Sequence, residues 1–275
     1  MNKILVTGSS GKVGRVVVEE LKQAGERVRT ATRNPVGPDA VELDWNNPAT
    51  FQPALAGVNR VFLMSPSSEP APKDFLLPFL AQAADGRRKI VLMSEGTTDV
   101  DETAPMRPVE TAVQSCGSPY VILRPNWFMD NFHTLWLGPI LEAGIIPVPA
   151  ADSHISFIDS RDIAAAATAA LCSDRFDRRV LTITGPTALN FYEAAQAISA
   201  VSGRNVTYVP IDDVAFRQSL LATGLPSELV DYLSNIFAHT RRGLAAAVTP
   251  AIEDLCGRPP HTFADYASHR ADAWK

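Results

Sequence analysis

Two hydrophobic periodicities alternate along the first half of the chain. Short apolar and β-branched runs predict strands, and the segments between them repeat apolar residues every three or four positions, which predicts helices. In residues 12–24, for example, Val13, Val17 and Leu21 fall on one helical face. The predicted strands are residues 4–7, 27–32, 40–43, 60–64, 89–94 and 120–124, and the predicted helices are residues 12–24, 48–55, 74–84 and 109–115.

Strands at this spacing, joined by helices, pair in parallel through right-handed crossovers. The first half therefore predicts an α/β fold of the Rossmann type, a doubly wound parallel sheet. The second half is less regular and contains no low-complexity linker. We expect a Rossmann core over residues 1–146 and a small C-terminal α/β cap over residues 147–275, interwoven with the core.

The pattern in the second half predicts strands and helices at less even intervals. Gly185 and Pro186 break the chain between two of these segments. The predicted strands are residues 155–158, 180–184 and 206–210, and the predicted helices are residues 160–172, 189–202, 212–223, 227–239 and 262–274.

Composition excludes several classes of function. The 275 residues include 25 Lys and Arg against 30 Asp and Glu, a net charge of −5, whereas a nucleic-acid partner would need a basic surface. The chain has no apolar stretch of about 18 residues, so no membrane span is expected. It opens directly on a strand-like run, without a signal-peptide layout, and is expected to be cytoplasmic. Its histidines and three scattered cysteines show no metal-ligand spacing, so we predict no metal.

A glycine-rich loop joins the first predicted strand to the first predicted helix. Gly8 permits a sharp turn, Gly11 lets the backbone approach a pyrophosphate, and Gly14 allows close contact between helix and sheet. The free N–H groups and the positive dipole end of such a helix hold phosphates. The loop therefore predicts a dinucleotide site, whose phosphate-binding residues are Gly8, Ser10, Gly11, Lys12, Val13 and Gly14.

The end of the second predicted strand indicates which dinucleotide binds. NAD-preferring sites place a carboxylate there to accept hydrogen bonds from the ribose 2′-hydroxyl. Residues 31–35 contain no carboxylate, and Arg33 offers a planar fork suited to a 2′-phosphate. The sequence thus favours NADP(H) over NAD(H), and the alternative for Arg33 is a solvated surface arginine.

Longer motifs point to a known family. Together with the glycine loop, residues 32–35, 43–44, 61–64, 123–132, 157–164 and 181–186 resemble the NmrA-like, atypical branch of the short-chain dehydrogenase/reductase superfamily. Within it the chain is similar to the group of NADPH:quinone reductases, triphenylmethane-dye or azo reductases and ergot-type iminium reductases. The resemblance implies that Asp44 and Trp45 lie near the adenine and that Ser65, Pro66 and Ser94 line the cofactor groove. It also places Asn126, Trp127 and Phe128 beside the nicotinamide, as the expected substrate-binding residues.

The chain departs from the wider superfamily at the position of the usual proton donor. Ordinary members carry Tyr-x-x-x-Lys, but the corresponding stretch here runs from Met106 to Glu110. Methionine cannot donate a proton, and glutamate cannot stabilise a phenolate. A substrate that is already a strong electrophile needs little help from an acid. Holding it close to the hydride donor in the right orientation alone lowers the activation free energy by up to about 7–11 kcal/mol. The main hypothesis is therefore an NADPH-dependent reductase, monomeric or homodimeric, acting on a small aromatic or iminium-type substrate such as a quinone, iminium ion or quinone methide.

The sequence leaves open which residue donates a proton, and whether the protein turns over a substrate or only binds the cofactor. His133 and Glu110 are the candidate catalytic residues, with Glu110 expected to orient substrate or hold a helix end; the alternatives are a structural histidine and a solvated helix carboxylate. Phe132 and Trp136 are expected to pack the interface between the sheet and the cap. Two other functions fit the same residues: a regulatory protein that senses NADP(H) without turnover, and an isomerase or cyclase of a biosynthetic intermediate.

Overall fold

The computed structural model describes residues 2–66 and 69–275, which form two compact units. The first unit contains the chain up to Pro125 together with Ser160–Thr182 and Ala251–Gly257. The second contains Asn126–Asp159, Ile183–Pro250 and Arg258–Lys275. Each unit is thus assembled from segments far apart in the sequence. The assignment of the cofactor to residues 1–146 and of the substrate to residues 147–275 stays a prediction.

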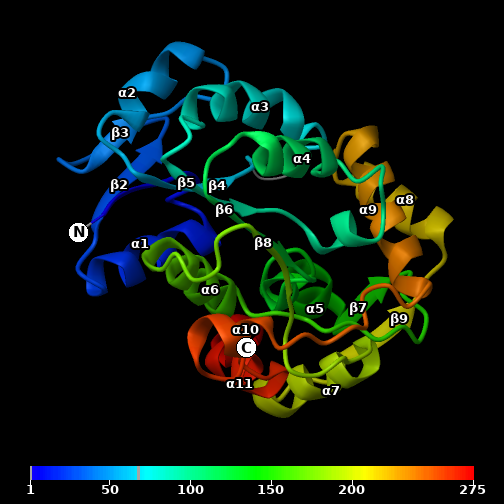
Figure 1. The fold of residues 1–275 in the computed structure, drawn as a ribbon. Helices are drawn as coiled ribbons and strands as arrows, with labels where there is room; N and C mark the ends of the chain where they lie inside the picture. The colour runs from blue at the N-terminus through cyan, green and yellow to red at the C-terminus, as the bar shows by residue number, and fades with distance from the viewer. Residues whose placement is uncertain (1, 67–68) are drawn as a thin grey trace. The chain divides into compact units, whose positions relative to one another are not determined.

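A seven-stranded sheet with the order β3-β2-β1-β4-β5-β6-β8 forms the centre of the first unit (Figure 1). The neighbouring pairs from β3 to β6 are all parallel. The strand order reverses beside β1, as in a doubly wound sheet. The predicted Rossmann fold is confirmed. The strands are β1 (Lys3–Val6), β2 (Arg27–Thr32), β3 (Ala40–Glu42), β4 (Arg60–Met64), β5 (Lys89–Met93), β6 (Tyr120–Pro125) and β8 (Arg179–Ile183).

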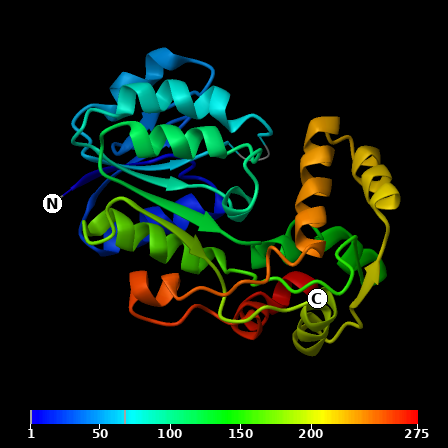
Figure 2. The same ribbon diagram turned by 45° about the vertical axis from the view of Figure 1, so that its right-hand side comes forward.

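Helices cover both faces of this sheet (Figures 1 and 2). On one face, α1 (Lys12–Gln23) packs along α6 (Ser160–Cys172), which also contacts α10 (Ala251–Cys256). On the other face lie α2 (Phe51–Leu55), α3 (Pro72–Ala83) and α4 (Arg107–Ser115). Because both faces are covered, the central strands are apolar along nearly their whole length; Val61, Leu92 and Ile122 are fully buried. This packing fixes the carboxyl ends of β1 to β6 along one edge of the sheet.

The second unit is built around an aromatic core. Phe132 lies at its centre, with ring centroids 4.7 Å from Trp136, 5.3 Å from Phe157 and 5.1 Å from Phe263. Phe132 and Trp136 are buried in this core, so their structural role is as expected, although they pack within the second unit and not at an interface with the sheet. Around this core lie the parallel pair β7 (Ile145–Val148) and β9 (Thr207–Pro210), and the helices α5 (Leu137–Ala143), α7 (Phe191–Ser202), α8 (Asp213–Ala222), α9 (Ser227–Arg241) and α11 (Phe263–His269).

Two predictions for the second half were wrong, and one interval contains elements that were not predicted. Residues 155–158 form no strand and make only two isolated bridges, Ile155 with Leu189 and Phe128 with Ile158. The helix predicted over residues 262–274 is two pieces, α11 and a 3₁₀ turn at Ala271–Trp274, separated at Arg270. The interval between residues 137 and 148, left without elements in the prediction, holds α5 and β7.

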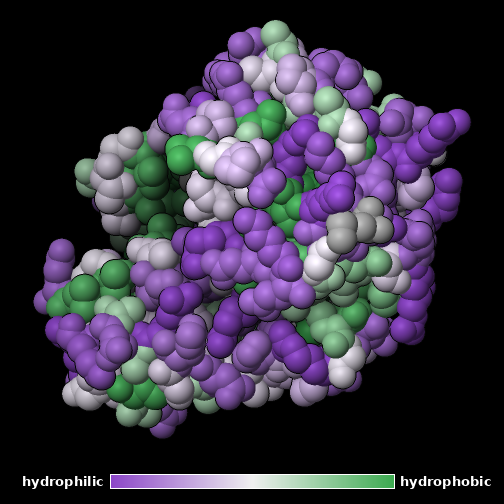
Figure 3. All heavy atoms as spheres, turned by 90° about the vertical axis from the view of Figure 1, so that its left-hand side faces the viewer, coloured by the Kyte–Doolittle hydropathy of each residue, from purple (hydrophilic) through white to green (hydrophobic). Residues whose placement is uncertain are grey.

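The surface in Figure 3 is mainly hydrophilic, with hydrophobic side chains in separate small groups. No helix among residues 2–66 and 69–275 is long and apolar enough to cross a membrane.

Candidate functional site

The glycine loop connects β1 to α1 in a tight turn. Gly11 N donates to Gly8 O at 2.9 Å, and Gly8 has a φ of +60°, in the left-handed region that favours glycine. Before the turn, the fully buried Thr7 donates its hydroxyl to Phe62 O at 3.1 Å and accepts from Met64 N at 3.0 Å. The loop is therefore anchored to the end of β4 through one threonine side chain.

Gly14 is required by a close approach within this loop. A Cβ atom on Gly14 would lie 2.2 Å from Gly8 O and 2.7 Å from Gly8 C, well inside any real contact. The close contact is between the first turn of α1 and the loop backbone, and not between helix and sheet as the spacing predicts. Only glycine allows α1 to begin so close to the turn.

The amino end of α1 is suited to binding an anion. Gly11 is its N-cap and has no side chain to cap the helix, and the first turn contains no acid. Ser10, Gly11 and Lys12 are exposed, whereas Val13 is buried and can offer a phosphate only its backbone N–H. Free N–H groups and the positive end of the helix dipole are the requirements for binding phosphate.

The predicted adenosine-side residues follow β2 and β3, at the same edge of the sheet. Arg33 is exposed directly after β2, and none of the described residues forms an ion pair or hydrogen bond with its guanidinium. Asp44 caps a turn by accepting from Asn46 N at 3.0 Å. Trp45 packs edge-on against Phe79, with centroids 5.5 Å apart. Arg33 is thus available to a ligand, whereas Asp44 and Trp45 also have structural contacts.

Ser65 and Pro66 follow β4, next to the loop. The Ser65 hydroxyl oxygen is buried and has no hydrogen-bond partner among the described residues. Leaving a buried polar group unpaired costs about 1–3 kcal/mol. A polar ligand at the carboxyl end of β4 would remove that cost, which fits the predicted cofactor groove.

A buried charged cluster joins the carboxyl ends of β5 and β6. Glu110, in the first turn of α4, is 1% exposed and accepts from Arg124 Nη2 at 2.6 Å and from Arg124 Nε at 3.0 and 3.2 Å. Ser94 Oγ lies 2.5 Å from Glu110 Oε1, and Asp99 forms an ion pair with the other side of Arg124. Burial lowers the pKa of Arg124, but its hydrogen bonds and charge interactions with Glu110 and Asp99 outweigh that effect and raise the pKa.

This cluster buries Glu110 and gives it a specific set of contacts, so the alternative of a solvated helix carboxylate is wrong. Both of its carboxylate oxygens accept hydrogen bonds, so the geometry favours holding Ser94 and Arg124 over donating a proton. Sequence reasoning named Glu110 and Ser94 but missed Arg124, Thr98 and Asp99. The available signal was a charged residue, Arg124, at the end of an otherwise apolar strand.

The predicted substrate-binding residues belong to the second unit. Asn126 Nδ2 donates to Ser156 Oγ at 2.7 Å and to Ala245 O at 2.8 Å. Trp127 stacks on Trp136 at 6.1 Å and contacts Phe237 at 4.9 Å, and Phe128 forms a bridge to Ile158. These contacts fix the segment in place, and its position beside a nicotinamide stays a prediction.

His133 is bound to a core tyrosine. Its Nδ1 lies 2.8 Å from Tyr266 Oη, and its Nε2 lies 3.9 Å from Asp130 Oδ1. Burial, followed by the charge of Asp130, raises the pKa of Tyr266 far above its usual value, so the phenol stays protonated. This hydrogen bond connects the 3₁₀ turn at Met129–His133 to α11, which favours the structural alternative for His133.

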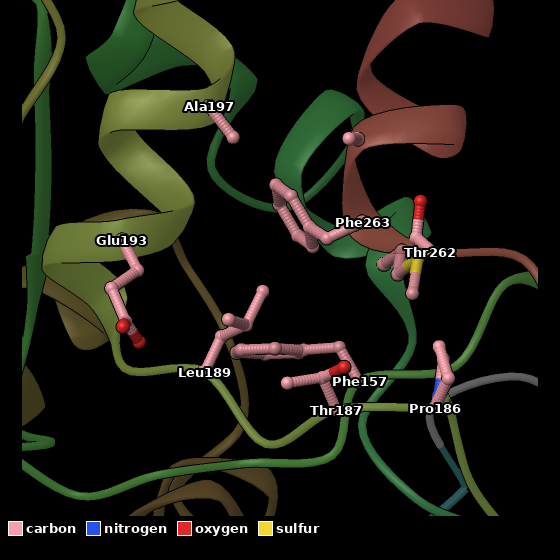
Figure 4. A pocket seen from close by; sticks show the side chains of 10 residues that line it. Phe157, Pro186, Thr187, Leu189, Glu193, Ala197, Thr262 and Phe263 are labelled. Atoms are coloured by element: carbon pink, nitrogen blue, oxygen red, sulfur yellow. The ribbon is translucent and has the colours of Figure 1, made fainter.

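A separate apolar pocket of about 250 Å³ lies within the second unit (Figure 4). Phe157, Leu189 and Phe263 line it, and Glu193 stands at its edge, where the carboxylate accepts from Asn190 N at 2.9 Å as part of a helix cap. None of the predicted site residues lines this pocket. Within the described part of the chain, no three His, Cys, Asp or Glu side chains are placed to hold a metal.

Known proteins resemble the chain along almost its whole length. The profile of the NmrA-like family matches residues 1–267. Prestalk A differentiation protein A of Dictyostelium discoideum is 30% identical over 96% of this chain and 91% of its own, and the NAD(P)H azoreductase of Xenophilus azovorans is 31% identical over 98% and 99%. The structure of an NADPH-dependent quinone oxidoreductase from Escherichia coli, complexed with NADPH, has a TM-score of 0.86 at 25% identity, covering 97% of this chain and 99% of that one.

Proposed function

Because the chain belongs to the NmrA-like family, we propose that it is an NADPH-dependent reductase of conjugated aromatic or iminium-type electrophiles such as quinones. Relatives that reduce azo compounds and quinones with NAD(P)H support the general class predicted from the sequence, an NAD(P)H-dependent oxidoreductase. The observation that carries the proposal is the glycine loop, in which α1 begins at a glycine N-cap, directly after a turn that only glycine allows.

The strand order of the sheet supports one orientation of the dinucleotide. With its diphosphate at α1, its adenosine half extends over the loops after β2 and β3, and its nicotinamide half over the ends of β4, β5 and β6. Arg33 would pair with the 2′-phosphate, and Ser65 and Ser94 stand on the nicotinamide side. When bound, NADPH supplies a hydride, and the protein's own task is to hold donor and acceptor in line and exclude water.

The missing acid restricts the substrate. Glu110 occupies the end of the stretch where the wider superfamily has Tyr-x-x-x-Lys, and it is buried and bound to Arg124. No group there can donate a proton to a simple ketone. A quinone, iminium ion or quinone methide accepts a hydride without that help, which supports these substrates over carbonyls.

The direct test is stopped-flow measurement of NADPH absorbance with a panel of quinones, azo dyes, triphenylmethane dyes and cyclic iminium ions. We expect NADPH consumption with at least one member, and none with an unactivated ketone as the control. A protein that binds NADPH but oxidises it with no member of the panel would contradict the reductase and favour NADP(H) sensing.

Arg33→Ala should weaken NADPH binding by about 1.5–3 kcal/mol, the usual contribution of a charge-assisted hydrogen bond, and leave NADH binding nearly unchanged. Arg27→Ala is the matched control, because Arg27 is an exposed arginine at the opposite, amino end of the same strand. Isothermal calorimetry with both nucleotides measures the effect. Equal losses for NADPH and NADH would rule out a contact with the 2′-phosphate.

A further inference from the structure

The Ser94 hydroxyl donates its hydrogen bond to another residue of the protein. Ser94 is 7% exposed and its Oγ lies 2.5 Å from Glu110 Oε1. A carboxylate bound to a guanidinium is an acceptor only, so the hydroxyl must be the donor in this hydrogen bond. Three further contacts from Arg124 keep the carboxylate in place. Glu110 therefore determines the direction in which Ser94 points its hydrogen.

With its proton used, Ser94 Oγ offers only lone pairs. A hydroxyl has two acceptor sites. Thr98 Oγ1 lies 3.4 Å away and is fully buried, so it can occupy at most one of them. The other remains for a donor that approaches the carboxyl end of β5.

The sheet identifies which part of a dinucleotide reaches this position. Ser94 follows β5, two strands from β1 on the side opposite β2 and β3. The nicotinamide half extends to that side when the diphosphate lies at α1. Its carboxamide nitrogen is a donor without acceptor capacity, and so is complementary to an oxygen that can only accept.

We propose that Glu110 is a positioning residue that fixes Ser94 Oγ as the hydrogen-bond acceptor for the carboxamide N–H of the bound nicotinamide. The inference rests on the proposed function, since it requires the dinucleotide to bind. Ser94 then orients the nicotinamide ring and cannot protonate a substrate, in keeping with a preference for electrophiles that need no acid.

The test compares NADP⁺ with its 3-acetylpyridine analogue, in which a methyl group replaces the carboxamide NH₂ and removes only the donor. Dissociation constants are measured by calorimetry for the wild type, Ser94→Ala, Glu110→Gln and Asp99→Asn. We expect the wild type to bind NADP⁺ roughly 3- to 10-fold more tightly than the analogue, the range of one neutral hydrogen bond. Ser94→Ala and Glu110→Gln should abolish this preference, and Asp99→Asn should keep it because Glu110 and Ser94 remain in contact.

Each outcome bears on the proposal. A wild type without the preference, a preference that survives Ser94→Ala, or its loss in Asp99→Asn would overturn it. A preference that survives in Glu110→Gln would likewise overturn the role of Glu110. Should that variant fail to fold, Ser94→Ala still decides whether Ser94 Oγ is the acceptor, because it leaves the ion pair between Glu110 and Arg124 intact. A wild type that binds neither dinucleotide would instead contradict the proposed function, so the two failures are distinguishable.

Discussion

Gly14→Ala is expected to abolish NADPH binding, with a loss of more than about 100-fold. The added Cβ would lie 2.2 Å from Gly8 O, so the loop or the first turn of α1 must shift. A shift displaces the N–H groups that face the diphosphate, and two lost charge-assisted hydrogen bonds correspond to about 3–6 kcal/mol. Calorimetry with NADPH measures the loss.

Gly138→Ala provides the matched control for that substitution. No atom lies within 4 Å of a Cβ at Gly138, and its φ is not positive. This variant should bind NADPH like the wild type. The thermal midpoint of Gly14→Ala should fall only modestly, since overpacking usually costs about 1–3 kcal/mol. Unchanged NADPH affinity in Gly14→Ala would show that the glycine loop does not hold the phosphates.

Glu110→Gln is expected to lower the free energy of unfolding by about 3–5 kcal/mol. Both carboxylate oxygens contact Arg124, so the amide NH₂ of glutamine must face the guanidinium whichever way it is turned. The variant leaves the buried Arg124 with one charged partner, Asp99, which is exposed. Removing one partner of a buried ion pair typically lowers the free energy of unfolding by about 3–5 kcal/mol. Urea unfolding, followed by circular dichroism, measures the change.

Two further variants distinguish the loss of the buried ion pair from a general destabilisation of the fold. Asp99→Asn removes the partner of Arg124 whose side chain is 53% exposed, and should cost only about 0–1 kcal/mol. Replacing Glu110 and Arg124 together by Leu and Met should recover much of the stability, because no unpaired charge then remains buried. Similar losses for Glu110→Gln and Asp99→Asn would show that burial of the pair has no special energetic role.

The sequence predicted the first unit well because its signals are local. Parallel strands covered on both faces are short apolar runs, and the helices between them have one apolar side, so β1 to β6 and α1 to α4 follow from periodicity. The glycine loop was visible for the same reason. Spacing alone could not show that Gly14 approaches the Gly8 carbonyl, because that contact depends on where the helix axis lies.

The second half was harder to predict for physical reasons. β7 has four residues, one of them Pro147, which lacks an N–H and weakens any strand signal. Residues 155–158 have the composition of a strand, yet tertiary contacts leave them with two bridges. The pairing of Glu110 with Arg124 joins a helix to a strand, and a single sequence gives no sign of which distant charges meet.

The most direct test is calorimetric titration of the folded wild-type protein with NADPH and with NADH. We expect one site per chain, with NADPH bound roughly 10- to 150-fold more tightly, the range that corresponds to one charge-assisted contact from Arg33 to the 2′-phosphate. Absence of binding by either nucleotide to well-folded protein would contradict both the dinucleotide site and the reductase proposed from it.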